Sequence, residues 1–284
     1  MVMELVLGTL TLIVLLIAAY TDLKTREVPD WLNYAFIFAA VGIRTLFSFQ
    51  DGWFTVVSGF LGLMAGLLLA CVFYYTNQWG GGDGKLLMGL GATIGIAYPF
   101  TAASLALLWY FLLVLLIGAL FGLLWMSVIA LPKRLLVGRE WKKYLFLYKG
   151  FHLGTAALSL ALLLVSIQIS LSWWLVPVPL LFFYLFLFVL SVEKVGFCKE
   201  IPIGNVTEGD WLAQAVRVNG KKIRLGKTLE KSDLAILYRL AREKKISTVV
   251  IKQGVPLVPS FLLAYLMMMF GKEWVLNILG RMMG

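Results

Sequence analysis

The sequence WGGGDGK at residues 79–85 is a short polar interruption between two long apolar runs. Its single acid is Asp83, and an ionisable side chain at the edge of a bilayer is costly, which makes it a candidate for function. A second acid, Asp22, closes the first apolar run and is followed by LKTREVPD at residues 23–30. We therefore expect Asp22 and Asp83 to be functional partners.

The composition is that of an integral membrane protein. Of the 284 residues, 61% are hydrophobic and 14% are charged, whereas soluble domains carry roughly 25% charged residues. The formal net charge is +10, but the cations cluster between apolar runs, as they do in cytoplasmic loops of membrane proteins. We therefore expect the lipid bilayer, and not nucleic acid, as a partner. The first run starts at Leu5 with no preceding Lys or Arg and lacks an Ala-x-Ala site, so a removable signal peptide is not expected.

The sequence contains no obvious set of metal ligands. Cys71 lies in an apolar run and Cys198 in a polar one, they form no CxxC pair, and His152 is the only histidine. Isolated residues of these types predict neither a disulfide nor a zinc site. We therefore expect no metal site and no cofactor.

Apolar runs of about 20 residues cross the bilayer core as helices. The sequence predicts about eight such helices, at residues 5–20, 32–49 and 54–76, two within 86–131, two within 151–192 with a turn at 170–174, and one at 255–270. Arg44 lies within the second helix and is expected to extend its side chain towards the headgroups. Residues 132–150 form a predicted loop that carries six Lys or Arg against one acid, Glu140.

The polar sequence at residues 193–253 predicts a small soluble α+β unit. Asn219-Gly220 lies between two alternating segments and is a strong hairpin signal. Ser232-Asp233 is expected to cap a helix that runs to about Lys244, and residues 248–252 have a strand pattern. The expected fold is thus an all-α polytopic membrane protein with a small cytoplasmic α+β insertion. Its predicted parts are a membrane helical domain at 1–192, the α+β unit at 193–253, and a last helix with an amphipathic tail at 254–284.

Counting helices places both acids at one membrane face. The cation-rich loop and the soluble unit are expected in the cytoplasm by the positive-inside rule. Counting back two spans from the loop places Asp83 on the cytoplasmic side, and counting back two more places Asp22 there as well. We therefore predict a multi-pass protein of the cell membrane with both acids at its cytoplasmic face and its amino terminus outside.

Two carboxylates at one face predict acid–base chemistry. When such groups lie close together they cannot both ionise cheaply, so the pair shares one proton. The ionised member takes a proton from water while the protonated member hydrogen-bonds the scissile carbonyl, as in aspartic proteases. Gly80, Gly82 and Gly84 have no β-carbon, which would allow an extended substrate backbone to approach Asp83 closely.

At these residues the chain resembles the type IV prepilin peptidases and preflagellin (prearchaellin) peptidases, which belong to the GxGD class of membrane aspartic proteases. Residues 80–86, GGGDGKL, resemble the GxGDxKL signature of that family. Residues 22–30, DLKTREVPD, are similar to the stretch around its first catalytic aspartate. Residues 254–259, GVPLVP, resemble the Pro-rich opening of its last membrane helix. The resemblance is strongest over residues 5–131 and 250–270.

This resemblance implies that Asp22 and Asp83 are the catalytic pair of an endopeptidase. The enzyme would cut between the short basic leader and the hydrophobic N-terminal helix of a prepilin-like or preflagellin precursor at the cytoplasmic face. Lys85 would be a membrane-edge anchor or a neighbour of the pair, and Pro256 and Pro259 would shape a helix start or contact substrate. Bacterial members that also methylate the new N-terminus usually carry a pair of CxxC motifs. Because this sequence has none and its soluble unit is more like the archaeal branch, it predicts peptidase activity alone.

Three other functions are weighed against this one. Presenilin-like and signal-peptide-peptidase-like enzymes also use GxGD chemistry, but they usually have Tyr-Asp at the first site and a late Pro-Ala-Leu motif, whereas Thr21 precedes Asp22 here. A transporter that couples ions through its acids would carry them within several spans near the midplane. A purely structural subunit of a secretion machine would need neither aspartate.

Overall fold

The computed structural model describes residues 2–271, apart from residues 77, 170–172, 219, 227 and 253. The chain divides into a first unit, Met1–Gly122 with Val255–Gly284, and a second unit, Leu123–Gly254. The boundary expected after residue 192 lies inside the second unit. The predicted tail beyond residue 271 lies outside the described residues, as does most of the predicted turn at 170–174.

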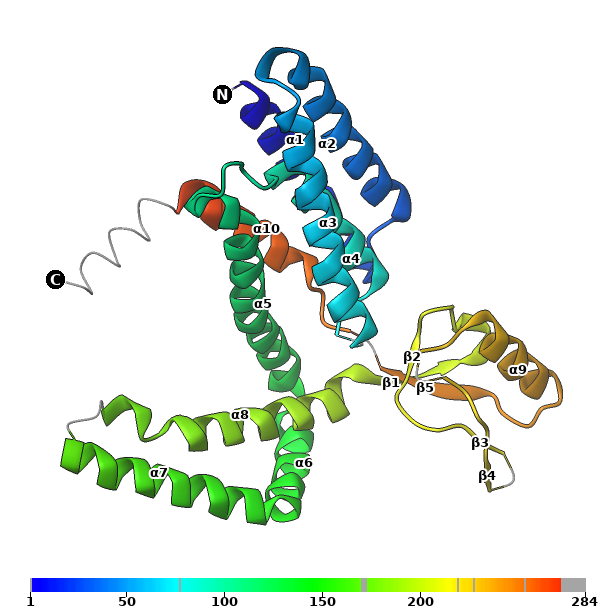
Figure 1. The fold of residues 1–284 in the computed structure, drawn as a ribbon. Coiled ribbons are helices and arrows are strands. Elements are labelled where there is room, and N and C mark those ends of the chain that lie inside the picture. Colours follow the sequence, from blue (N-terminus) through cyan, green and yellow to red (C-terminus); the bar gives the residue numbers. More distant parts are fainter. Residues whose placement is uncertain are drawn as a thin grey trace. The chain divides into compact units, whose positions relative to one another are not determined.

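The first unit is a group of helices that includes the first and the last described helices of the chain (Figure 1). Its elements are α1 (Val2–Thr25), α2 (Asp30–Asp51), α3 (Phe54–Tyr75), α4 (Gly81–Ile94), the beginning of α5 (Ala106–Ala130), and α10 (Val258–Phe270). Helices α1, α2 and α3 cover the first three predicted spans. Helix α10 packs against α1 although it is the last described helix of the chain, so the first and last described helices meet in this unit.

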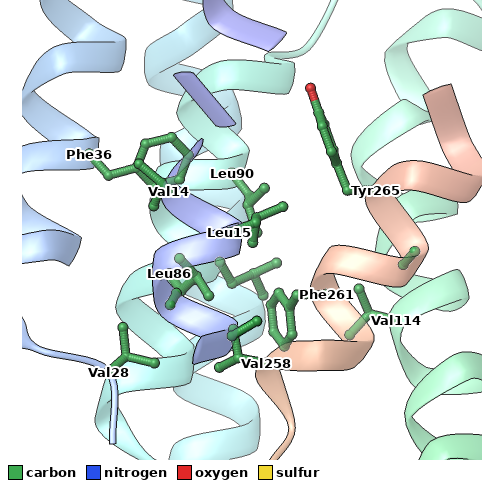
Figure 2. Close-up of a cluster of buried hydrophobic side chains, with 14 of the residues drawn as sticks. Val14, Leu15, Val28, Phe36, Leu86, Leu90, Val114, Val258, Phe261 and Tyr265 are labelled. Atoms are coloured by element: carbon green, nitrogen blue, oxygen red, sulfur yellow. The ribbon is translucent and has the colours of Figure 1, made fainter. Parts of the chain in front are cut away.

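The core of the first unit lies where α1, α4 and α10 meet. Leu15 of α1, Leu86 and Leu90 of α4, and Phe261 of α10 are fully buried in one cluster. Figure 2 shows these side chains together, with Val258 at the start of α10 beside them. Because lipid tails are as apolar as leucine, helices within a bilayer associate mainly through such close packing.

Helices α3 and α4 approach each other at their backbones. A β-carbon added at Gly62 would lie 2.1 Å from the carbonyl oxygen of Gly91, and one added at Gly66 would lie 2.7 Å from that of Leu87. Neither position has room for a side chain. The spacing of small residues on α3 is that of a membrane-helix packing motif, and it holds α4 directly against α3.

Arg44 is buried, with 5% of its surface exposed. Its guanidinium donates three hydrogen bonds to backbone carbonyls, from Nε to Ala92 (2.7 Å), from Nη2 to Thr93 (2.8 Å) and from Nη1 to Thr55 (3.0 Å). The prediction that Arg44 reaches towards the headgroups is therefore wrong. Carbonyl groups at the end of α4 have no hydrogen-bond partner within the helix. The buried guanidinium of Arg44 supplies the N–H donors that they lack.

The second unit begins with helices and ends in a small α+β part. It contains the end of α5, α6 (Arg134–Leu147), α7 (Lys149–Ile169), α8 (Val178–Val192), β1 (Cys198–Pro202), β2 (Trp211–Leu212), β3 (Arg217–Val218), β4 (Lys221–Lys222), α9 (Lys231–Arg242) and β5 (Thr248–Lys252). The prediction of a loop at 132–150 is wrong for most of its length, because α6 covers it. The Leu, Lys, Arg and Glu residues of this segment are strong helix formers. The loop was predicted from the charge of the segment alone, without regard to this helix propensity.

The α+β part has its own core and follows the predicted pattern. Strands β1, β5 and β2 form an antiparallel sheet with β5 in the centre, and its buried residues include Leu237 and Val249. Strands β3 and β4 pair as the predicted hairpin; Asn219 of its turn lies outside the described residues. Helix α9 begins at Lys231, before the predicted cap residues Ser232 and Asp233, because Asp233 accepts a hydrogen bond from the N–H of Glu230 (3.2 Å) and so caps the helix from its third position.

Among the described residues, six helices are long and apolar enough to cross a membrane. This confirms a mostly helical, polytopic membrane protein, but not the predicted count of eight. Helix α4 has 14 residues and α10 has 13. At 1.5 Å per residue they extend about 21 Å and 20 Å, less than the roughly 30 Å of a bilayer core. These two short helices carry or contact the residues that the sequence singles out.

Candidate active site

Asp22 lies in the last turn of α1 and is buried, with 5% of its surface exposed. The helix ends at Thr25, and Arg26 takes a left-handed conformation with φ 64°, so the chain turns away immediately after the acid. The charge of Arg26 interacts with the Asp22 carboxylate. Burial lowers the pKa of the Arg26 guanidinium, and the neighbouring carboxylate partly offsets this effect.

The carboxylate of Asp22 contacts the N-terminus of α10. Its Oδ2 accepts a hydrogen bond of 2.8 Å from the N–H of Val258, the first residue of that helix. The N–H of Leu257 also interacts with this carboxylate. The N-terminus of a helix carries unpaired N–H groups and a partial positive charge, both of which favour an anion. Asp22 therefore acts as a cap for α10 across 236 residues of sequence.

Pro256 and Pro259 are both buried at the start of α10. Pro259 is the second residue of the helix, where its missing N–H costs nothing and its fixed φ favours the helical turn. The hydroxyl of Ser260 donates to the carbonyl of Leu257 (2.5 Å) and tightens the same turn. The prolines thus lie where they shape the helix start that faces Asp22.

Asp83 is the third residue of α4 and is half-buried. Its Oδ2 accepts a hydrogen bond of 3.3 Å from the N–H of Gly80, the residue that precedes the helix, which is one half of a capping box. The carboxylates of Asp83 and Asp22 are close enough for their charges to interact. The structure therefore brings the two predicted acids together at one end of the first unit.

The first turn of α2 holds the first turn of α4 in place. The Nδ2 of Asn33 donates to the carbonyl of Gly82 (3.2 Å). The Nζ of Lys85 donates to Oδ1 of Asp30 (2.6 Å) and lies 5.1 Å from the centre of the Tyr34 ring. Lys85 is thus a neighbour of the pair that ties α4 to α2.

Sequence analysis included Asp30 in the motif that follows Asp22 but gave it no contact, and it did not single out Asn33 or Tyr34. Asp30, Asn33 and Tyr34 have the spacing i, i+3 and i+4, which places them on one face of a helix. Their polar character at the start of an otherwise apolar helix is the signal by which they could have been found.

The glycines around Asp83 have different surroundings. A β-carbon at Gly84 would lie 3.2 Å from that of Ala70, and one at Gly82 would lie 3.4 Å from that of Val28. Gly84 is buried, whereas Gly80 is exposed. The missing side chain of Gly84 therefore serves the contact with α3, and the more open backbone lies at Gly80.

The functional groups that this site offers for catalysis are the carboxylates of Asp22 and Asp83. Within the part of the chain that the structure describes, no three His, Cys, Asp or Glu side chains gather as metal ligands do. Two interacting carboxylates, each at a helix N-terminus, can share one proton, which leaves one member charged and the other neutral. Such a pair holds an acid and a base side by side.

The ion pair between Asp30 and Lys85 is expected to stabilise the first unit measurably. Partly exposed pairs contribute about 0.2–1 kcal/mol. In a double-mutant cycle, Asp30→Asn and Lys85→Met should therefore show a coupling of that size in the free energy of unfolding in detergent. The longer pair between Glu140 and Lys143 (3.7 Å) is the control and should couple more weakly. Fully additive effects of Asp30→Asn and Lys85→Met would contradict this assignment.

The region of the chain that carries both acids is similar to known proteins. Residues 9–127 match the type IV leader peptidase family. The chain is 32% identical over 87 residues to a preflagellin peptidase of Methanococcus voltae, which covers 30% of this chain and 37% of that protein. It is 36% identical over 81 residues to a preflagellin peptidase of Methanocaldococcus jannaschii, covering 28% and 34%.

These matches span little more than a third of each relative's length. No solved structure matches the chain. The matched region contains Asp22, Asp83, Asp30 and Lys85, while Pro256 and Pro259 lie beyond it. The match therefore supports the resemblance seen in the two acidic motifs: residues 9–127 of this chain are similar to the type IV leader peptidase family.

Proposed function

We propose that this protein is a membrane-embedded aspartic endopeptidase that removes the short basic leader from prepilin-like or preflagellin precursors. The observation that carries the proposal is that Asp22 and Asp83 lie at one end of the first unit, close enough for their charges to interact. Both acids lie within the region that matches the leader peptidase family. The two curated relatives, which are preflagellin peptidases, support a precursor of that type as the substrate.

The reaction uses the pair as one acid and one base. The ionised carboxylate removes a proton from a water molecule, which attacks the scissile carbonyl, and the protonated carboxyl hydrogen-bonds the carbonyl oxygen. No nucleophilic side chain takes part. The exposed backbone at Gly80 supports an extended substrate beside the pair, since a residue without a side chain leaves room for another backbone.

The site lies at the cytoplasmic face of the cell membrane in this proposal. The leader of such a precursor is basic and short, and the segment behind it is a hydrophobic helix. A pair at the edge of the bilayer suits that junction, because the helix stays in lipid while the charged leader stays in water. Asp22 lies at the end of an apolar span and Asp83 at the start of a short apolar helix, as such a junction requires.

A cleavage assay tests the proposed function. The full chain in liposomes is given either a preflagellin-type precursor or an unrelated secretory signal peptide of equal hydrophobic length. We expect cleavage of the first, at the junction between leader and helix, and at least about tenfold slower cleavage of the second, which corresponds to a difference of about 1.4 kcal/mol in transition-state binding. Equal cleavage of both would favour a signal-peptide-peptidase-like enzyme. Ion uptake into the liposomes without any cleavage would favour a transporter.

A further inference from the structure

We propose that Asp22 is the charged member of the pair and acts as the general base, with the N-terminus of α10 as the element that positions it and keeps it ionised. Asp83 is then the protonated general acid. This inference rests on the proposed function and goes beyond it, because it gives each carboxyl its role and gives α10 a part in the reaction.

The two carboxyls differ in the hydrogen bonds that they accept. Asp22 receives a short bond of 2.8 Å from Val258 at the positive end of another helix, and the N–H of Leu257 adds to it. Asp83 receives a longer bond of 3.3 Å from Gly80 within its own turn. Both acids lie at a helix N-terminus, which favours negative charge, so the difference lies in the bonds themselves: short bonds from N–H groups are typical of ionised carboxylates. The ionised form is therefore better supported at Asp22.

Neighbouring charges point the same way. The charged groups that face Asp22 are Arg26, which follows it in the chain, and Asp83 on α4. Helix α2 presents Asp30, whose carboxylate forms an ion pair with Lys85. Helix α10 presents backbone N–H groups to Asp22. Asp22 thus has a cation beside it, whereas the charged neighbour of Asp83 is Asp22 itself, which disfavours a second negative charge.

Helix α10 is held firmly enough to act as a positioning element. Its carbonyl at Phe261 accepts a hydrogen bond from the buried hydroxyl of Tyr110 on α5 (3.0 Å). Its Tyr265 donates to the carbonyl of Gly8 on α1 (2.9 Å). With 13 residues, α10 is shorter than a bilayer span, yet it is fixed to α1 and α5 by two tyrosine hydroxyls. The N–H of Val258 is therefore presented to Asp22 from a defined place.

The reaction balances with these roles. Asp22 takes a proton from water as the water oxygen bonds to the scissile carbon, and Asp83 gives its proton to the carbonyl oxygen, which yields a neutral gem-diol. When the carbon–nitrogen bond breaks, Asp22 gives its proton to the leaving amine. Asp83 takes back a proton from a gem-diol hydroxyl as the new carboxyl group forms. Both residues return to their starting states.

Removal of one backbone N–H tests this assignment. Incorporation of the α-hydroxy acid analogue of valine at position 258 replaces that amide by an ester and keeps the side chain. If Asp22 is the base, the acidic limb of the pH profile of kcat/KM for precursor cleavage moves up by about one pH unit, since a hydrogen bond to a charged group is lost, and the alkaline limb stays. If Asp83 is the base, the same change moves the alkaline limb alone. A shift of the alkaline limb, of both limbs, or of neither overturns the proposal.

Matched variants control for a general loss of structure. The same ester replacement for leucine at the exposed Leu263 of α10 removes an ordinary helix bond and should move neither limb. Tyr110→Phe loosens the anchor of α10 and should move the acidic limb in the same direction by a smaller amount, which decides the matter if the ester at 258 does not fold. Tyr238→Phe removes a similar hydroxyl-to-carbonyl bond (3.2 Å) in the second unit and should leave the profile unchanged. Absence of precursor cleavage by the unmodified chain would instead refute the proposed function.

Discussion

Asp22→Asn and Asp83→Asn are each expected to slow precursor cleavage by about 10²–10⁴-fold, the contribution typical of a positioned acid or base. Either change removes a group that must exchange a proton with water or with the scissile bond. Asn keeps the size of Asp and still accepts hydrogen bonds, so the N–H of Val258 and that of Gly80 retain their partners. The loss should therefore appear in kcat, with the thermal midpoint of the protein close to that of the unmodified chain.

Asp51→Asn is the matched control for this prediction. Asp51 is exposed at the last position of α2, while α2 contributes to the site through its first turn. The control should cleave at the unmodified rate, as expected for a surface change away from the site. Time courses of precursor cleavage at equal protein concentration make the comparison. If either Asp22→Asn or Asp83→Asn cleaved within a few-fold of the control, the aspartic mechanism would be excluded.

The two acids were predictable from the sequence because a charge between apolar runs is a local signal. Asp22 and Asp83 each interrupt a hydrophobic stretch, and the count of helices between them gives a shared face. Their nearest contacts were not predictable in the same way. The partner of Asp22 is a backbone N–H at Val258, which any residue other than proline supplies, so no side-chain pattern marks it. Only the nearby prolines, Pro256 and Pro259, indicate that a helix begins there.

The hydrophobicity of the sequence alone did not predict the lengths of the two short helices, α4 and α10. A run of apolar residues predicts a span, but the length of the helix within it depends on packing that the run does not encode. Helix α4 ends at Ile94, and Gly95 follows with φ 72°, a conformation that favours glycine. The glycine content of this region was visible in the sequence. Its consequence, direct contact with the backbone of α3, depends on Gly62 and Gly66, which lie in a different run.

Arg44→Met is expected to lower the free energy of unfolding of the first unit by about 3 kcal/mol or more. The change leaves the carbonyls of Ala92, Thr93 and Thr55 without the guanidinium donors that they now have, and each buried group without a partner costs about 1–3 kcal/mol. Arg44→Lys should recover part of the loss, since an ammonium group cannot reproduce the planar fork of three donors. Chemical unfolding in detergent micelles, followed by tryptophan fluorescence, measures both variants.

This loss should reach the site through α4, because Arg44 of α2 donates to carbonyls at the C-terminal end of this short helix, and Asp83 lies in its first turn. The guanidinium near its last carbonyls complements the helix dipole, so the C-terminal end of α4 is held by charge as well as by packing. We therefore expect Arg44→Met to reduce precursor cleavage in proportion to the fraction unfolded and by a further few-fold in the folded protein. Arg139→Met, at an exposed arginine of α6, should change stability by less than about 0.5 kcal/mol and leave cleavage intact. If Arg44→Met matched that control in both measurements, the buried guanidinium would have no part in holding α4, and the placement of Asp83 would have to depend on the first turn of α2 alone.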